Sequence, residues 1–187
     1  MANSNNSVIT GKFKGSLGKE LVFREWAGKT VVAKAPKART GAATAAQAKT
    51  QEKFLLAARY AKFIINDPAM VAGYAASLRP RQNVYSRALE DFINPPAVVG
   101  ITSRGYTGAV GDILTIRAKD DFRVANVLLE IYAADGTLLE QGNCLQNNNG
   151  VDYTYTAKQA NPSLAGCTIK AIAFDVPGNE GSLELIL

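Results

Sequence analysis

The chain has 187 residues, of which 47% are hydrophobic and 20% are charged, a balance typical of folded globular domains. It contains no histidine, which removes the commonest general base, the usual metal ligand and every nucleophile arrangement that depends on an imidazole. We therefore predict that the protein is not an enzyme, and we assign no catalytic residue, no metal site and no cofactor.

The formal net charge of +5 conceals two parts of opposite sign. Residues 1–96 carry 15 Lys and Arg against 6 Asp and Glu, whereas residues 97–187 carry 6 against 10. Pro95 and Pro96 stand at the change of sign and favour an extended link over a continuing helix. The predicted domain organisation is a polar N-terminus (1–11), a basic hairpin-helix domain (12–94), a Pro-Pro link (95–96) and an all-β domain (97–187).

The N-terminal stretch MANSNNSVITG lacks the basic and apolar regions of a secretory signal, and no run of about 18 apolar residues follows it. We expect synthesis in the cytoplasm without a signal peptide or a membrane span. A protein of this kind that acts outside its cell has to leave by lysis, by a dedicated machine, or as part of a phage or another particle.

The segments ELVFREW (20–26) and TVVAK (30–34) are rich in β-branched and aromatic residues and predict a β-hairpin with a loop of three or slightly more residues. Alternation divides the first segment between two faces: Leu21, Phe23 and Glu25 on one, and Val22, Arg24 and Trp26 on the other. Because neither face is purely apolar, we expect the hairpin to pack on the following helices, on a partner, or on both.

Three glycines precede the hairpin at nearly regular spacing: Gly11, Gly15 and Gly18. They lack the flanking strand and helix that a nucleotide-binding glycine loop requires, so we interpret them as turn residues.

Three helices are predicted between residues 44 and 94. The first runs from about Thr44, a plausible N-cap, to Ile65, because apolar residues recur there at spacings of three and four. Its predicted apolar positions are Phe54, Ala57, Ala58, Ala61, Ile64 and Ile65. The second runs from about Ala69 to Leu78, after Asp67 and Pro68. The third extends from about Asn83 to Asn94 and is expected to bury Tyr85, Ala88, Leu89 and Phe92.

Short strand-like runs alternate with turn residues from residue 98 to the end of the chain, and their spacing predicts a sandwich of about seven strands. The clearest runs are DILTIRAK, VANVLLEIYAADG, TLLEQGN, VDYTYTAK, CTIKAIAFD and SLELIL. Asp135 and Gly136 predict a tight hairpin turn. Alternation from Cys167 to Ala173 predicts one small apolar face.

Two further groups of residues, the cysteines and four acids in predicted turns, could form a disulfide or bind a metal ion. Cys144 and Cys167 are interpreted as buried reduced thiols, with a disulfide within the domain as the alternative. The acids Asp120, Asp121, Asp175 and Glu180 lack the spacing of a calcium loop, so we interpret them as solvated turn residues with no reason for a perturbed pKa.

Two resemblances add to this interpretation. Residues 10–92 contain a hairpin with two Gly-Lys steps, the basic exit GKTVVAKAPK and a Thr- and Gln-rich helix start, and they resemble a family of short, basic bacterial proteins of unknown function. The stretches VDYTYTAK and TIKAIAFDVPGNEG resemble the last strands of bacterial immunoglobulin-like modules, in which an Asp-x-x-Gly-Asn turn joins the final two strands. This second resemblance covers residues 97–187 and implies an immunoglobulin-like sandwich that serves as a spacer, adhesion or assembly module.

The first functional hypothesis is a structural protein that assembles with its own copies or with other structural proteins into a particle, fibre, tube or phage virion. The residues predicted to make its contacts are Phe23, Arg24, Trp26, Lys29, Lys34, Lys37 and Arg39.

The second functional hypothesis is a nucleic-acid-associated protein that uses residues 12–39 to contact phosphates, with Trp26 or Phe23 for stacking. It adds Lys12, Lys14 and Lys19 as phosphate contacts. The third, an enzyme, has the least support because histidine is absent.

Overall fold

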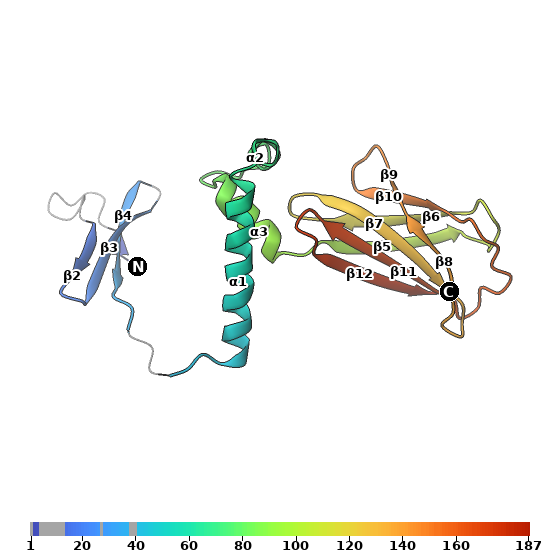
Figure 1. Cartoon of the computed structure of the whole chain (residues 1–187), viewed down its shortest axis with the longest axis horizontal. Coiled ribbons are helices and arrows are strands. Elements are labelled where there is room, and N and C mark those ends of the chain that lie inside the picture. The colour runs from blue at the N-terminus through green and yellow to red at the C-terminus, as the bar shows by residue number, and fades with distance from the viewer. Residues whose placement is uncertain (1, 4–13, 27, 38–40) are drawn as a thin grey trace. The chain divides into compact units, whose positions relative to one another are not determined.

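The computed structural model describes residues 2–3, 14–26, 28–37 and 41–187 (Figure 1). Contacts divide the chain into two compact units, Met1–Lys49 and Thr50–Leu187. The second unit therefore contains most of the first helix, the other two helices and all the C-terminal strands. Compactness and independent folding are different properties, so the predicted domain limits at residues 12–94 and 97–187 stay predictions.

The first unit is built around an antiparallel sheet with the strand order β1-β4-β3-β2. Its strands are β1 (Ala2–Asn3), β2 (Gly15–Leu17), β3 (Leu21–Trp26) and β4 (Lys29–Lys34). Strands β3 and β4 form the predicted hairpin, but Trp26 pairs with Lys29, so the connection has two residues and not the expected three or more. Gly28 lies in this connection with a φ of +74°, a conformation that glycine adopts without strain.

The structure tests two of the three upstream glycines. Gly18 lies in the turn between β2 and β3 with a φ of +59°, as predicted. Gly15 belongs to β2 and pairs with Phe23, so its interpretation as a turn residue is wrong. Gly11 lies outside the described residues.

The three predicted helices are confirmed, each with the cap that the sequence indicates. They are α1 (Ala45–Ile64), α2 (Pro68–Ala75) and α3 (Val84–Ile93). The Thr44 hydroxyl accepts from the Gln47 amide at 3.3 Å before α1. The Asp67 carboxylate accepts from two amides at the start of α2, and Asn83 forms a reciprocal capping box with Ser86 before α3. None of the described helices combines the length and the apolar character needed to cross a membrane.

The C-terminal strands form two antiparallel sheets with the orders β5-β6-β10-β9 and β12-β11-β7-β8. The first contains β5 (Ala97–Gly105), β6 (Ile113–Lys119), β9 (Leu145–Gln146) and β10 (Asp152–Thr156). The second contains β7 (Val124–Tyr132), β8 (Leu138–Asn143), β11 (Thr168–Asp175) and β12 (Glu180–Ile186). Each of the six runs predicted from the sequence corresponds to one of these strands, and the structure adds β5 and the two-residue strand β9.

One hydrophobic core joins the two sheets in the manner of a β-sandwich. It includes Leu114 and Ile116 from β6, Leu129 from β7 and Ile169 from β11, all fully buried. The predicted small apolar face of β11 is confirmed, because alternate residues from Cys167 to Ala173 are buried. The β7–β8 hairpin also forms at the predicted turn, where Gly136 has a φ of +84°.

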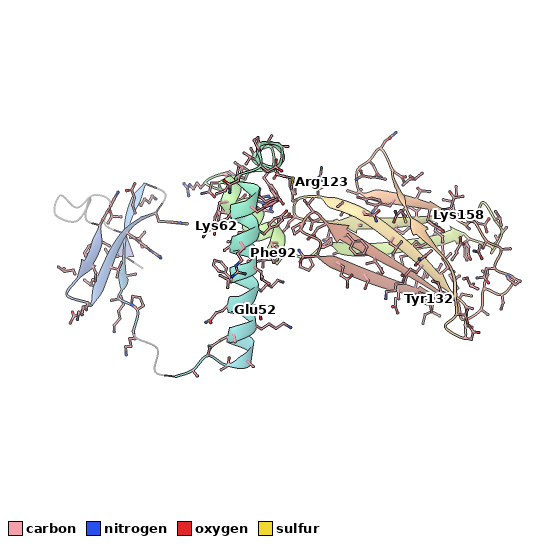
Figure 2. All side chains as sticks on the ribbon, viewed as in Figure 1. Glu52, Lys62, Phe92, Arg123, Tyr132 and Lys158 are labelled. Atoms are coloured by element: carbon pink, nitrogen blue, oxygen red, sulfur yellow. The ribbon has the colours of Figure 1, made fainter. Side chains whose placement is uncertain are left out.

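The helices and the sandwich meet within the second unit through a mixed apolar and polar contact. The Tyr74 ring of α2 stacks on Phe122 at 4.1 Å between centroids, and Asn179 donates its side-chain amide to the Phe92 carbonyl at 3.1 Å. In Figure 2, the labelled residues Phe92 and Arg123 lie at this junction, whereas Tyr132 and Lys158 lie toward the opposite end of the sandwich.

Candidate functional site

The N-terminal sheet is the first candidate surface, because its described residues form strands but no buried apolar core. Among the described residues of Met1–Lys49, Thr30 alone is buried. In the part of the chain that the structure describes, both hydrophobic clusters of buried residues belong to the second unit. A small sheet needs an apolar face covered by another element to be stable in water. The described part of this sheet therefore has exposed apolar surface that no other element covers.

The exposed apolar side chains of the sheet are large. Trp26 is 68% exposed, Leu17 63% and Leu21 39%. The half-buried residues of the sheet are Val22, Phe23, Val31, Val32 and Ala33. Tryptophan is enriched at the centres of protein interfaces, where its large ring is removed from water.

The strand register divides the predicted contact residues between the two faces. Directly paired residues share a face, so Trp26 lies with Lys29 at the end of the hairpin, and Arg24 lies on the same face. Phe23 and Lys34 lie on the opposite face. The sheet therefore places Arg24, Trp26 and Lys29 on one face, and Phe23 and Lys34 on the other.

The remaining predicted residues have different positions. Lys37 is exposed beyond the end of β4, and Lys19 is exposed in the turn before β3 with a φ of +58°. The Lys14 ammonium lies 2.7 Å from Glu25 Oε2, and this hydrogen bond and charge lower the pKa of the Glu25 carboxyl. Lys12 and Arg39 lie outside the described residues.

Helix α1 carries a second candidate surface that the sequence pattern did not indicate. Ala57, Ala61 and Ile64 are buried as predicted, but Phe54 is 54% exposed and Ile65 is also exposed. The large apolar side chains that α1 itself exposes are Phe54, Leu55, Leu56 and Phe63. We call this set the exposed apolar surface of α1. Phe54 and Leu55 border a shallow hollow with Thr50, Gln51 and Ala58.

The two cysteines lie in the interior of the described structure. Cys144 and Cys167 are both free and buried, in agreement with the interpretation as reduced thiols. Burial raises the pKa of the Cys144 thiol to about 12, so the thiolate is disfavoured at neutral pH.

Some acids interpreted as solvated turn residues are in fact buried. Asp175 is 3% exposed, and the Oδ1 atom of Asp120 is inaccessible to solvent. Burial raises the pKa of the Asp175 carboxyl. The interpretation failed because both acids lie where the helices cover the end of the sandwich. In the part of the chain that the structure describes, no three potential metal ligands are grouped to hold an ion.

Comparison with known proteins gives little similarity. Models of known protein families give no match, and no curated protein matches either. Three solved chains do match. One is an engineered protein with 15% sequence identity, a TM-score of 0.32, and coverage of 52% of this chain and 21% of its own. The chain thus spans about a fifth of that protein, and the similarity carries no functional argument.

Proposed function

We propose that this chain is a non-enzymatic structural protein that assembles through its basic N-terminal sheet and through strand edges. In this proposal it forms a subunit of a particle, fibre, tube or phage virion. The observation that carries the proposal is a sheet in which Thr30 is the one described residue that is buried. A partner that covers the sheet would supply the apolar contacts that the unit does not make for itself.

The charge distribution supports contacts between copies. Residues 1–96 are basic and residues 97–187 are acidic, so the N-terminal part of one copy is attracted to the C-terminal part of the next. A head-to-tail contact of this kind gives a ring if the rotation closes and a filament if it does not.

The exposed apolar surface of α1 supports the same proposal. Soluble monomers rarely leave several large apolar side chains uncovered on one element, because their burial is favourable. Phe63 is 68% exposed. We expect this surface to be covered in the assembled protein.

The C-terminal sheets would serve as the rigid carrier of these contacts. We propose that they form an immunoglobulin-like sandwich, in keeping with the Asp-x-x-Gly-Asn turn between β11 and β12. In that turn, the Asp175 carboxylate accepts from the Asn179 amide at 2.6 Å, and Gly178 has a φ of +93°.

One observation favours nucleic acid as a second candidate partner. Exposed Trp26 pairs with exposed Lys29, which places a ring that could stack on a base beside a cation that could contact a phosphate. This alternative predicts binding that weakens steeply with salt, since each phosphate contact releases counterions.

The two candidates are separated by size-exclusion chromatography with light scattering on the full chain. The sample is run at low and high salt, with and without nuclease, and absorbance is recorded at 260 and 280 nm. We expect a species larger than the monomer that persists after nuclease and has no excess absorbance at 260 nm. A monomer that carries nucleic acid at low salt and releases it at high salt would support the alternative.

Matched variants locate the contact. Trp26→Ala is expected to lower the assembly constant at least tenfold, whereas Val110→Ala, which truncates a 62% exposed residue in the turn between β5 and β6, is the control and is expected to leave it unchanged. Equal loss of assembly in both variants, or in neither, would contradict a contact centred on the N-terminal sheet.

Charge reversal tests the electrostatic part of the contact. The triple variant K29E/K34E/K37E is compared with R104E/K119E/K158E, in which exposed cations of the C-terminal part are reversed and the net charge changes by the same amount. We expect the first to dissociate the assembly and the second to retain it. Dissociation by both would indicate a dependence on net charge alone.

A further inference from the structure

A buried chain of hydrogen bonds runs through the helices toward the sandwich. The Tyr60 and Tyr74 hydroxyls lie 2.8 Å apart, and the Tyr74 hydroxyl donates to Asp91 Oδ2 at 2.6 Å. Asp91, on α3, is completely buried. These hydrogen bonds give Asp91 Oδ2 a donor, whereas the other carboxyl oxygen, Oδ1, receives none.

The second oxygen, Oδ1, is buried without a donor, and a second carboxyl lies beside Asp91. Asp120, in the loop between β6 and β7, is a side-chain hydrogen-bonding neighbour of Asp91. Asp120 Oδ2 already accepts from the Phe122 and Arg123 amides, each at 2.9 Å. The Oδ1 atoms of both Asp91 and Asp120 are buried and receive no donor. Two ionised carboxylates are both acceptors, so they can bond to each other only if one of them carries a proton.

We propose that Asp91 and Asp120 share one proton, so that the protonated Asp91 carboxyl donates to Asp120 and fastens α3 to the sandwich more strongly in acid than in alkali. This inference does not depend on the assembly proposed above, because the bond lies within one compact unit of the chain.

The other charged groups around the pair do not neutralise it. On α3, the Arg87 guanidinium donates to Glu90 Oε2, to Ser77 Oγ and to the Asp121 carbonyl. On β11, the Asp175 carboxylate is engaged by Asn179 and adds negative charge near Asp91.

The remaining titratable groups near Asp91 and Asp120 stay neutral or are bonded to other partners. Tyr60 on α1 and Tyr74 on α2 stay neutral donors, since burial raises the pKa of both hydroxyls. The Asp121 side chain is directed to other partners: its Oδ2 accepts from the Asn94 amide at 2.7 Å, and its Oδ1 lies 3.7 Å from Arg79. Arg79 also pairs with Glu90. No cation among the described residues is therefore bonded to the carboxyl of Asp91.

The direction of the titration agrees with the geometry. The pKa of Asp91 is raised to about 7, chiefly by burial and also by the negative charges of Asp120 and Asp175, while the Tyr74 hydrogen bond acts in the opposite direction. The unfolded carboxyl titrates near about 4. Between about pH 4 and pH 7, the folded protein therefore binds one more proton than the unfolded protein. Its contribution to stability is complete below about pH 4 and is lost as the pH rises through about 7.

Asp91→Asn tests this proposal because its amide can replace the protonated carboxyl. The amide nitrogen can donate to Asp120 and the amide oxygen can accept from Tyr74, without a titrating proton. The unfolding constants of wild type and variant are measured by urea and circular dichroism from pH 5 to 8, at a concentration where one species is present. We expect the wild-type constant to rise relative to that of Asp91→Asn by at least tenfold, with a limit of about tenfold per pH unit.

Glu52→Gln is the matched control, since it removes one carboxylate from an exposed position on α1 (Figure 2). Its unfolding constant is expected to follow wild type at every pH. If the ratio between wild type and Asp91→Asn does not change with pH, the shared proton is excluded.

A spectroscopic measurement on wild type keeps the proposal testable if Asp91→Asn does not fold. Isotope-edited carboxyl NMR of Asp-labelled protein is expected to show an aspartate that titrates near neutral pH. Asp120→Asn, which removes the acceptor's charge, is expected to lower the pKa of that aspartate. The proposal fails if all aspartates are ionised at pH 6.

Discussion

The N-terminal sheet and the C-terminal sandwich have similar local sequences but different burial. Both have alternating β-branched and aromatic residues, and both form antiparallel strands. In the sandwich, strand β11 buries every second residue against a second sheet, whereas β3 has no fully buried residue. Strand formation therefore follows from local pattern, but stability in water depends on what covers the strand.

The largest expected difference between the two regions comes from truncating a leucine in each. Leu129→Ala removes a fully buried side chain from the sandwich core and is expected to cost about 2–5 kcal/mol in the free energy of unfolding. Leu21→Ala, at a 39% exposed position, is expected to cost less than about 0.5 kcal/mol in the monomer. Urea unfolding of both variants measures this. Equal costs would show that the N-terminal sheet has a core of its own.

A smaller effect is expected where the Pro-Pro link meets the sandwich. A Cβ at Gly181 on β12 would overlap the Pro96 carbonyl, so Gly181→Ala is expected to cost about 1–3 kcal/mol by displacing the link. Gly100→Ala on β5 is the control, because a Cβ there meets no atom within 4 Å. Thermal unfolding compares the two, and an unchanged melting temperature for Gly181→Ala would contradict the close packing of the link.

The smallest difference concerns helix caps in the two units. Asn83→Ala removes the cap of α3, which packs on the sandwich, and is expected to cost about 1 kcal/mol. Thr44→Ala removes the cap of α1, whose first five residues belong to the first unit and are exposed. We expect it to fray only that turn and to cost less than about 0.5 kcal/mol, measured by urea unfolding. A larger cost for Thr44→Ala would reverse the comparison.

Local signals predicted the secondary structure well. Asp67 and Asn83 marked helix starts, Asp135 and Gly136 marked a hairpin turn, and alternation after Cys167 identified a core strand. These features depend on neighbours within a few residues in the sequence. The helices and the β-sandwich arrangement could therefore be predicted before the structure.

The errors arose from contacts between distant segments. Arg87 and Asp91 are charged residues outside the set that the helical pattern predicts to be buried, yet both are buried. Their partners, Asp121 and Tyr74, lie 34 and 17 residues away in the sequence. The exposure of Phe54 was missed for the related reason that periodicity identifies an apolar face but not whether another element covers it.

The most direct test of the account is hydrogen exchange followed by mass spectrometry on the full chain at low and high protein concentration. We predict that amides of strands β3 and β4 exchange rapidly in the dilute monomer and become protected in the assembled protein, while amides of the core strands β6, β7 and β11 stay protected in both. Equal, slow exchange of strands β3 and β4 at every concentration would contradict the claim that the N-terminal sheet acquires its stability from a partner.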